Sequence, residues 1–96
     1  MVLQTRRINY WRDKRGHEVD FVLAERGRQP IAIECKWSAA GFDPSGLQAF
    51  RRQYEKGENY IVVNDVGKTV RRSLGKISVT LTTIPGLIKS LRAGAR

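Results

Sequence analysis

The sequence has a single cysteine among its 96 residues and no long apolar run. One cysteine excludes an intramolecular disulfide framework and a cysteine-rich zinc module. No segment approaches the ~18 consecutive apolar residues of a membrane-spanning helix, so we expect no membrane partner. Residues 1–7 contain two arginines with no apolar stretch behind them, which does not fit a secretory signal. Together these absences favour a protein of the reducing cytoplasm.

Acidic residues are also few, and the charge balance is strongly basic. There are 9 Asp and Glu against 18 Lys and Arg, which gives a net charge of +9. Such an excess favours a polyanionic partner, with nucleic acid first. The basic residues form small clusters along the chain, which favours a folded basic surface over a disordered arm. We expect DNA contacts from Lys14, Arg15, His17, Arg51 and Arg52. The alternatives are a turn position for the histidine and a solvated helix face for the two later arginines.

The apolar residues, 41% of the chain, suffice for one ordinary core, so we expect a single domain over residues 1–96. Apolar periodicity predicts the strands, while Asp43-Pro44 and Thr83 predict helix starts. Residues 65–76 are polar and punctuated by glycine, and they receive no element. We expect Trp11 and Trp37 in the core or at its edge. The predicted strands are residues 8–12, 18–25, 30–37, 60–63 and 77–82, and the predicted helices are residues 44–55 and 84–93.

The order β-β-β-α-β-β-α predicts an α/β domain built on one mixed sheet. Residues 60–63 form a short, continuous apolar run of the kind found in buried parallel strands. With the helix before it, this run makes residues 30–63 a strand–helix–strand crossover.

Three of the few carboxylates lie inside strands that are otherwise apolar. Strand alternation places Glu18 and Asp20 on one face, and it places Glu34 and Lys36 on one face of the next strand. If the two strands pair as a hairpin, the carboxylates converge with the lysine beside them. The alternative is a water-exposed face of cross-strand ion pairs. The residues that alternation places on the opposite face of the first strand are Val19, Phe21 and Leu23.

A carboxylate cluster of this kind has a chemical use. Mg²⁺ takes oxygen ligands, usually one or two carboxylates together with water and phosphate. A bound ion neutralises a scissile phosphate and activates water, and a neighbouring ammonium stabilises charge on the phosphoryl group. The backbone carbonyl of Cys35 is a further candidate ligand. We expect its thiol to behave as a small buried apolar group, because no histidine is placed to activate it.

These residues also carry a family resemblance. Glu18-Val19-Asp20, a hairpin, and Ile33-Glu34-Cys35-Lys36 resemble the core motif of the PD-(D/E)XK nuclease superfamily. More narrowly, residues 10–22 resemble the nuclease-like C-terminal domain of a prokaryotic AAA-type ATPase family. The resemblance covers roughly residues 8–64, while residues 70–92 fit it only loosely.

The resemblance implies a restriction-endonuclease-like fold with a three-layer core and a bound Mg²⁺ or Mn²⁺. It implies Asp20 and Glu34 as metal ligands and Lys36 as the catalytic lysine. Glu18 matches a frequent acidic neighbour and is a further candidate ligand. Many superfamily members have another acidic residue upstream, whereas residues 1–12 here contain none.

The sequence therefore predicts a metal-dependent DNA endonuclease-like domain that hydrolyses phosphodiester bonds. One alternative is a degenerate nuclease-fold module for DNA binding or regulation, and another is a protein-interaction domain. The expected partners are DNA, held mainly through phosphates, a second copy of this small chain, and an ATPase domain in longer relatives.

Overall fold

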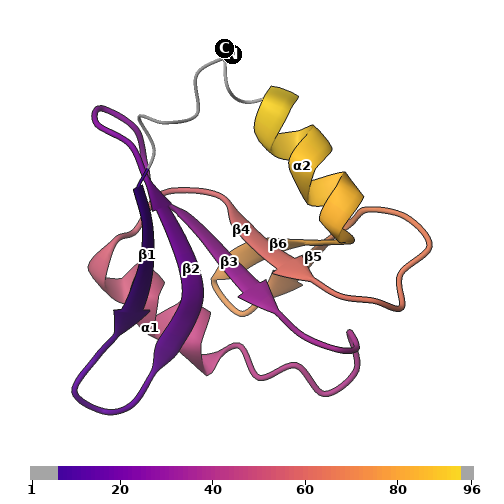
Figure 1. Ribbon diagram of the computed structural model, residues 1–96. Helices are drawn as coiled ribbons and strands as arrows, with labels where there is room; N and C mark the ends of the chain where they lie inside the picture. The colour runs from indigo at the N-terminus through magenta and orange to yellow at the C-terminus, as the bar shows by residue number, and fades with distance from the viewer. Residues whose placement is uncertain (1–6, 94–96) are drawn as a thin grey trace.

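The computed structural model describes residues 7–93, which form a mixed sheet with one helix on each face (Figure 1). The expectations for residues 1–6, and for Gly94 as the end of the last helix, lie outside the described residues. The strands are β1 (Arg7–Arg12), β2 (Glu18–Ala24), β3 (Ile31–Cys35), β4 (Asn59–Val62), β5 (Val70–Leu74) and β6 (Ile77–Thr82), and the helices are α1 (Ser45–Gln53) and α2 (Ile84–Ala93).

The six strands lie in the order β1-β2-β3-β4-β6-β5. β1, β2 and β3 pair antiparallel, β4 lies parallel to both β3 and β6, and β5 pairs antiparallel with β6. The prediction of an α/β domain with one mixed sheet is confirmed. The predicted element order is wrong in one place, because it lacks β5. The observed order is β-β-β-α-β-β-β-α. β5 is an edge strand that is almost wholly exposed, so its sequence lacks the apolar signal of a core strand.

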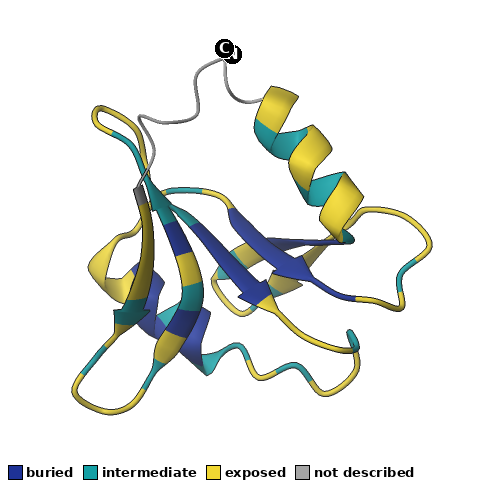
Figure 2. Ribbon diagram, in the orientation of Figure 1, coloured by how far each residue is buried: buried dark blue, intermediate teal, exposed yellow. Residues whose placement is uncertain are grey.

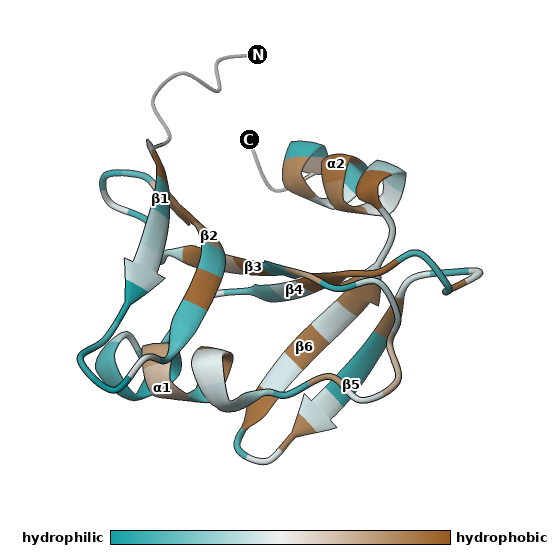
Figure 3. Ribbon diagram, turned by 60° about the horizontal axis from the view of Figure 1, so that its bottom comes forward, coloured by the Kyte–Doolittle hydropathy of each residue, from teal (hydrophilic) through white to brown (hydrophobic). Residues whose placement is uncertain are grey.

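The two helices bury opposite faces of the sheet, which makes three layers (Figures 1 and 3). Leu47 and Phe50 of α1 pack on apolar residues of β2, β3, β4 and β6, while Leu87 and Leu91 of α2 cover a smaller cluster on the other face. β4 is buried along its whole length, as expected for a parallel strand covered on both sides (Figure 2). In the described part of the chain, neither helix is long and apolar enough to cross a membrane.

A β-bulge interrupts the pairing of β1 with β2. Asn9 lies opposite Val22 and Trp11 lies opposite Val19, so one residue of β1 faces two residues of β2, Asp20 and Phe21. The extra residue brings Val19 and Val22 into the same core cluster under α1. The predicted alternation, which grouped Val19 with Phe21 and Leu23, is therefore wrong at Val19, because a strict period of two assumes an unbroken ladder.

The two tryptophans occupy different environments. Trp11 packs edge-on against Phe50, with the ring centroids 5.3 Å apart. Trp37 is 84% exposed, so its expected place in the core is wrong. β3 ends at Cys35, two residues before the predicted end of the strand, and the chain has left the sheet when it reaches Trp37.

Helix α1 approaches the sheet closely at its first turn. Asp43 accepts a hydrogen bond from the Ser45 backbone N–H at 3.0 Å just before the helix begins. Gly46 then lies directly against the backbone of β2, where a Cβ atom would clash with the carbonyl oxygen of Glu18. Glycine at this position therefore sets the distance between the helix and the strand that carries Asp20.

We expect Gly46→Ala to lower the free energy of unfolding by about 1–3 kcal/mol, because the added methyl group meets backbone that cannot rotate away. Gly67→Ala is the matched control, since a Cβ there meets no atom within 4 Å. We expect the control to stay within about 0.5 kcal/mol of the wild type. Urea unfolding followed by circular dichroism measures both, and equal stability of the two variants would contradict the close packing.

Candidate functional site

Asp20 and Glu34 lie next to each other on neighbouring strands, as the hairpin pairing predicts. The β2–β3 register ends at Phe21 opposite Ile33, so the next residues along the two strands are these two acids. The Asp20 carboxylate accepts a hydrogen bond from the backbone N–H of Cys35 at 2.9 Å. This bond fixes the Asp20 side chain across the end of β3, beside the Cys35 peptide that was predicted to supply a carbonyl ligand.

Glu34 is the unusual residue of the pair. Its side chain is buried, with 5% of the residue exposed, and it lies in register with Ile61 of β4. One carboxylate oxygen, Oε2, is buried without a hydrogen-bond partner. Burial raises the pKa of Glu34 to about 7, and the charge of Asp20 and a hydrogen bond with its carboxyl group act in the same direction. Burial and the neighbouring Asp20 thus both favour the protonated form of Glu34.

Lys36 stands at the exit of β3, beside this pair. Its backbone N–H donates to the carbonyl of Val62 at 2.8 Å, and its ammonium lies 5.8 Å from the ring centroid of Phe42. The pKa of Asp43 is lowered, chiefly by hydrogen bonds from Ser45 and in smaller part by the charges of Lys36 and His17. The charges of Lys36 and His17 thus both act on Asp43, just before the start of α1.

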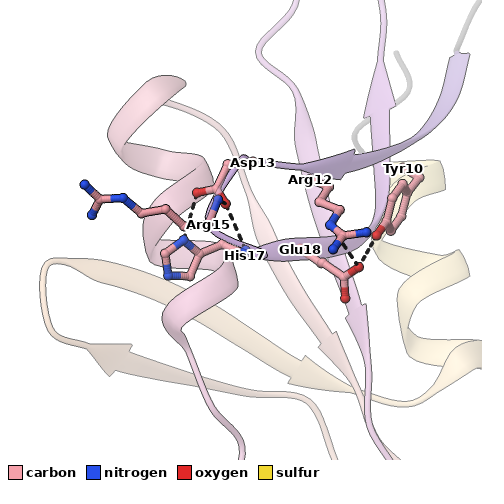
Figure 4. A network of polar contacts seen from close by, with 6 residues as sticks. All are labelled: Tyr10, Arg12, Asp13, Arg15, His17 and Glu18. Carbon is pink, nitrogen blue, oxygen red and sulfur yellow. Dashed lines mark hydrogen bonds and ion pairs between the residues drawn. The ribbon is translucent and has the colours of Figure 1, made fainter.

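Glu18 does not join the two other carboxylates. It accepts a hydrogen bond from the hydroxyl group of Tyr10 and lies 4.0 Å from the guanidinium of Arg12 (Figure 4). The hydrogen bond to Glu18 is the main reason that the pKa of Tyr10 is raised. β1 lies on the side of β2 opposite β3, and its side chains hold Glu18 on that side. In residues 7–93 no group of three histidine, cysteine or acidic side chains could hold a metal ion.

The Cys35 side chain has no sign of activation. Partial burial raises the pKa of the Cys35 thiol, and the charges of Asp20 and Glu34 raise it further. A thiol with a raised pKa stays protonated near neutral pH and is a poor nucleophile. The residue is exposed, where burial was predicted, because it is the last residue of β3.

His17 and Asp13 fasten the β1–β2 hairpin. Asp13 accepts backbone hydrogen bonds from Arg15 and His17, both at 2.9 Å, and its other oxygen lies 2.8 Å from the imidazole Nδ1 (Figure 4). Burial alone would raise the pKa of Asp13, but the hydrogen bonds from His17 and Arg15 outweigh it and lower the pKa. His17 is therefore a structural residue of the β1–β2 turn.

Basic side chains surround this hairpin. Arg15, His17 and Arg52 line one shallow cavity of about 280 Å³ between the hairpin and α1. Lys14 lines the adjoining hollow together with Arg15. Lys14, Arg15 and Arg52 are all exposed, so the structure gathers these predicted DNA contacts on one surface.

Arg51 is not part of that surface. It is buried, with 5% of the residue exposed, and burial lowers the pKa of its guanidinium to about 10. It donates to the side chain of Asn59 and to four backbone carbonyls, those of Pro30, Tyr54, Lys56 and Glu58. The expectation that Arg51 contacts DNA is wrong, because two consecutive helix residues point in different directions and only Arg52 reaches solvent.

Comparison with known proteins adds one match. A model of the family described as "Domain of unknown function (DUF4143)" matches residues 2–84. No curated protein and no solved structure matches the chain.

We expect Glu34 to make stability depend on pH. Its pKa in the folded protein, about 7, lies above the ordinary value of 4.5, so protonated Glu34 stabilises the fold below about pH 4.5. This contribution is lost as the pH rises through 7. Relative to Glu34→Gln, the wild type should lose on the order of 2–3 kcal/mol between pH 5 and pH 8. Urea unfolding with a chelator present measures this, and parallel pH profiles for the two proteins would contradict it.

Proposed function

We propose that this chain, which belongs to the DUF4143 family, is a metal-dependent nuclease-like domain that hydrolyses phosphodiester bonds in DNA. Asp20 and Glu34 would hold the ion, and Lys36 would act on the phosphate. The observation that carries the proposal is the buried, unpartnered Oε2 of Glu34 beside the carboxylate of Asp20.

The donor set fits a hard divalent cation. A buried carboxylate oxygen without a partner is costly unless something compensates it, and a cation does so. Two carboxylates and the Cys35 carbonyl are oxygen donors of the kind that Mg²⁺ and Mn²⁺ accept, with water and phosphate completing the shell. When bound, the ion would supply charge neutralisation at the phosphate and an activated water molecule.

The protein's own residues would prepare this chemistry. Glu34 would release its proton to solvent on binding a cation, because a ligating carboxylate is ionised, and its raised pKa would make binding depend on pH near neutrality. Asp20 is oriented by the Cys35 N–H, so that its other oxygen stays available. Lys36 follows the strand directly, and its ammonium would stabilise charge that builds up on the phosphoryl group.

The fold supports the same proposal at a coarser level. A sheet between two helices, with the carboxylates on an antiparallel pair and a strand–helix–strand unit after them, is compatible with the three-layer restriction-endonuclease-like core. The resemblance also motivates two partners beyond DNA: a second copy of the chain, and an ATPase domain in longer relatives.

A second candidate function is DNA binding or regulation without catalysis. One observation favours it: within residues 7–93 no third metal-ligating side chain joins Asp20 and Glu34, and Glu18 is held by Tyr10 and Arg12. Without the further acidic ligand of many superfamily members, the pair would hold Mg²⁺ more weakly, and cleavage would then be slow or absent.

Cleavage of plasmid DNA separates these functions. We expect slow nicking with Mg²⁺ or Mn²⁺ that falls at least about 100-fold in Asp20→Asn, Glu34→Gln and Lys36→Ala. Glu18→Gln is the matched control and should cleave like the wild type, since Glu18 lies outside the pair. Equal cleavage by all proteins would mark a contaminant and sink the nuclease function. Binding by all without cleavage would leave the second candidate.

We expect binding to duplex DNA to weaken steeply with salt, because phosphate contacts release counterions. Arg52→Ala should lower affinity for all sequences alike and reduce the salt slope by about one. Arg28→Ala is the control, since this side chain is paired with Glu25 at 3.0 Å on the hairpin at the other end of β2. Anisotropy titrations at several salt concentrations measure both. An absence of binding at low salt would favour a protein-interaction domain.

A further inference from the structure

Trp37 has the most exposed large apolar side chain in the described part of the chain, at 84%. Single exposed apolar residues are common on protein surfaces and need no function by themselves. Trp37 differs in its position, because it comes directly after Lys36 and three residues after Glu34. Three residues of extended chain span at most about 11 Å. The indole therefore lies within reach of a base next to a phosphate held at the candidate site.

The backbone that carries Trp37 is held on both sides. Its carbonyl accepts a hydrogen bond from the Asn64 N–H at 3.3 Å, and the preceding Lys36 N–H donates to Val62. Just beyond it, the Ser38 hydroxyl and the Ala39 N–H both donate to Asp65, at 2.7 and 3.0 Å. The segment is thus tied to the connection between β4 and β5 while the indole remains in solvent. A presented aromatic ring of this kind costs little ordering entropy when it binds a partner.

This inference rests on the proposed function: we propose that Trp37 stacks on an unpaired DNA base, beside a phosphate that Lys36 and a cation on Asp20 and Glu34 would hold. Within a continuous duplex, both faces of a base are covered by its neighbours, so an indole finds a free face only on single-stranded or extruded bases. The net charge of +9 supplies the attraction for phosphates that accompanies stacking in single-strand binding. The preferred substrate class is therefore DNA with a single-stranded stretch at the cleavage position.

The first measurement follows the fluorescence of Trp37 itself. Trp11→Phe leaves Trp37 as the sole tryptophan, and the phenyl ring keeps an aromatic contact with Phe50. With Ca²⁺ in place of Mg²⁺, which takes the same oxygen ligands but is a weaker Lewis acid, an oligo-dT 20-mer should quench this fluorescence at saturation, while a 20-bp duplex should leave it nearly unchanged. Unchanged fluorescence with saturating oligo-dT would overturn the proposal.

The second measurement is affinity in the same buffer. Trp37→Ala should weaken binding of oligo-dT by about five- to 100-fold and leave duplex affinity within about twofold. Trp37→Phe should restore most of the loss, because it keeps a stacking ring. Ile84→Ala is the matched control, since Ile84 is 62% exposed at the start of α2 and should change neither affinity. Unchanged oligo-dT affinity in Trp37→Ala would overturn stacking and assign Trp37 to a protein contact, and an equal loss on both DNAs would also overturn it.

Cleavage assays run in parallel distinguish failure of this inference from failure of the proposed function. Quenching by oligo-dT without any metal-dependent cleavage would keep the stacking role and remove the nuclease function. Cleavage of single-stranded and duplex DNA by Trp37→Ala at wild-type rates would keep the nuclease function and remove the stacking role.

Discussion

The buried guanidinium of Arg51 ties together the parts of the fold on which the candidate site depends. All five of its N–H donors are used, on the Asn59 side chain and on carbonyls before β3, after α1 and before β4. Burying a cation costs free energy, and this cost lowers the pKa of Arg51. The hydrogen bonds offset it, and they hold the starts of β3 and β4 side by side. The parallel register that follows places Glu34 opposite Ile61, inside the protein.

The buried carboxylate of Glu34 is energetically unfavourable in its surroundings, and a ligand-binding function would explain why it is there. An apolar side chain at Glu34 would suit its neighbours better, since one of its oxygens finds no donor and burial resists its charge. The hydrogen bond from the Cys35 N–H holds the Asp20 carboxylate beside Glu34, although the charge of Asp20 disfavours ionisation of Glu34 further. Such destabilising arrangements are typical of sites where a ligand supplies the missing compensation.

The surrounding groups lie at one end of the sheet. The β1–β2 hairpin carries its basic residues beside α1, and it leads into β2 at Glu18, two residues before Asp20, so the hairpin and the carboxylate pair are neighbours. Trp37 leaves β3 at the same end. A polyanion bound along the basic hairpin would therefore pass the carboxylate pair and the exposed indole. This common location joins positive charge, two neighbouring carboxylates and an aromatic ring in one proposed interface.

Local sequence determined five of the six strands, both helices and the proximity of Asp20 to Glu34, because apolar periodicity and hairpin pairing act over short distances. It could not show β5, whose exposed residues carry no apolar pattern and whose pairing depends on β6. Nor could it show the bulge in β2, the capture of Glu18 by β1, or the burial of Arg51. Each depends on how the strands and helices pack against one another, so only the tertiary structure decided that Glu18 stays apart from the pair, that Arg51 is buried, and that Trp37 is left exposed.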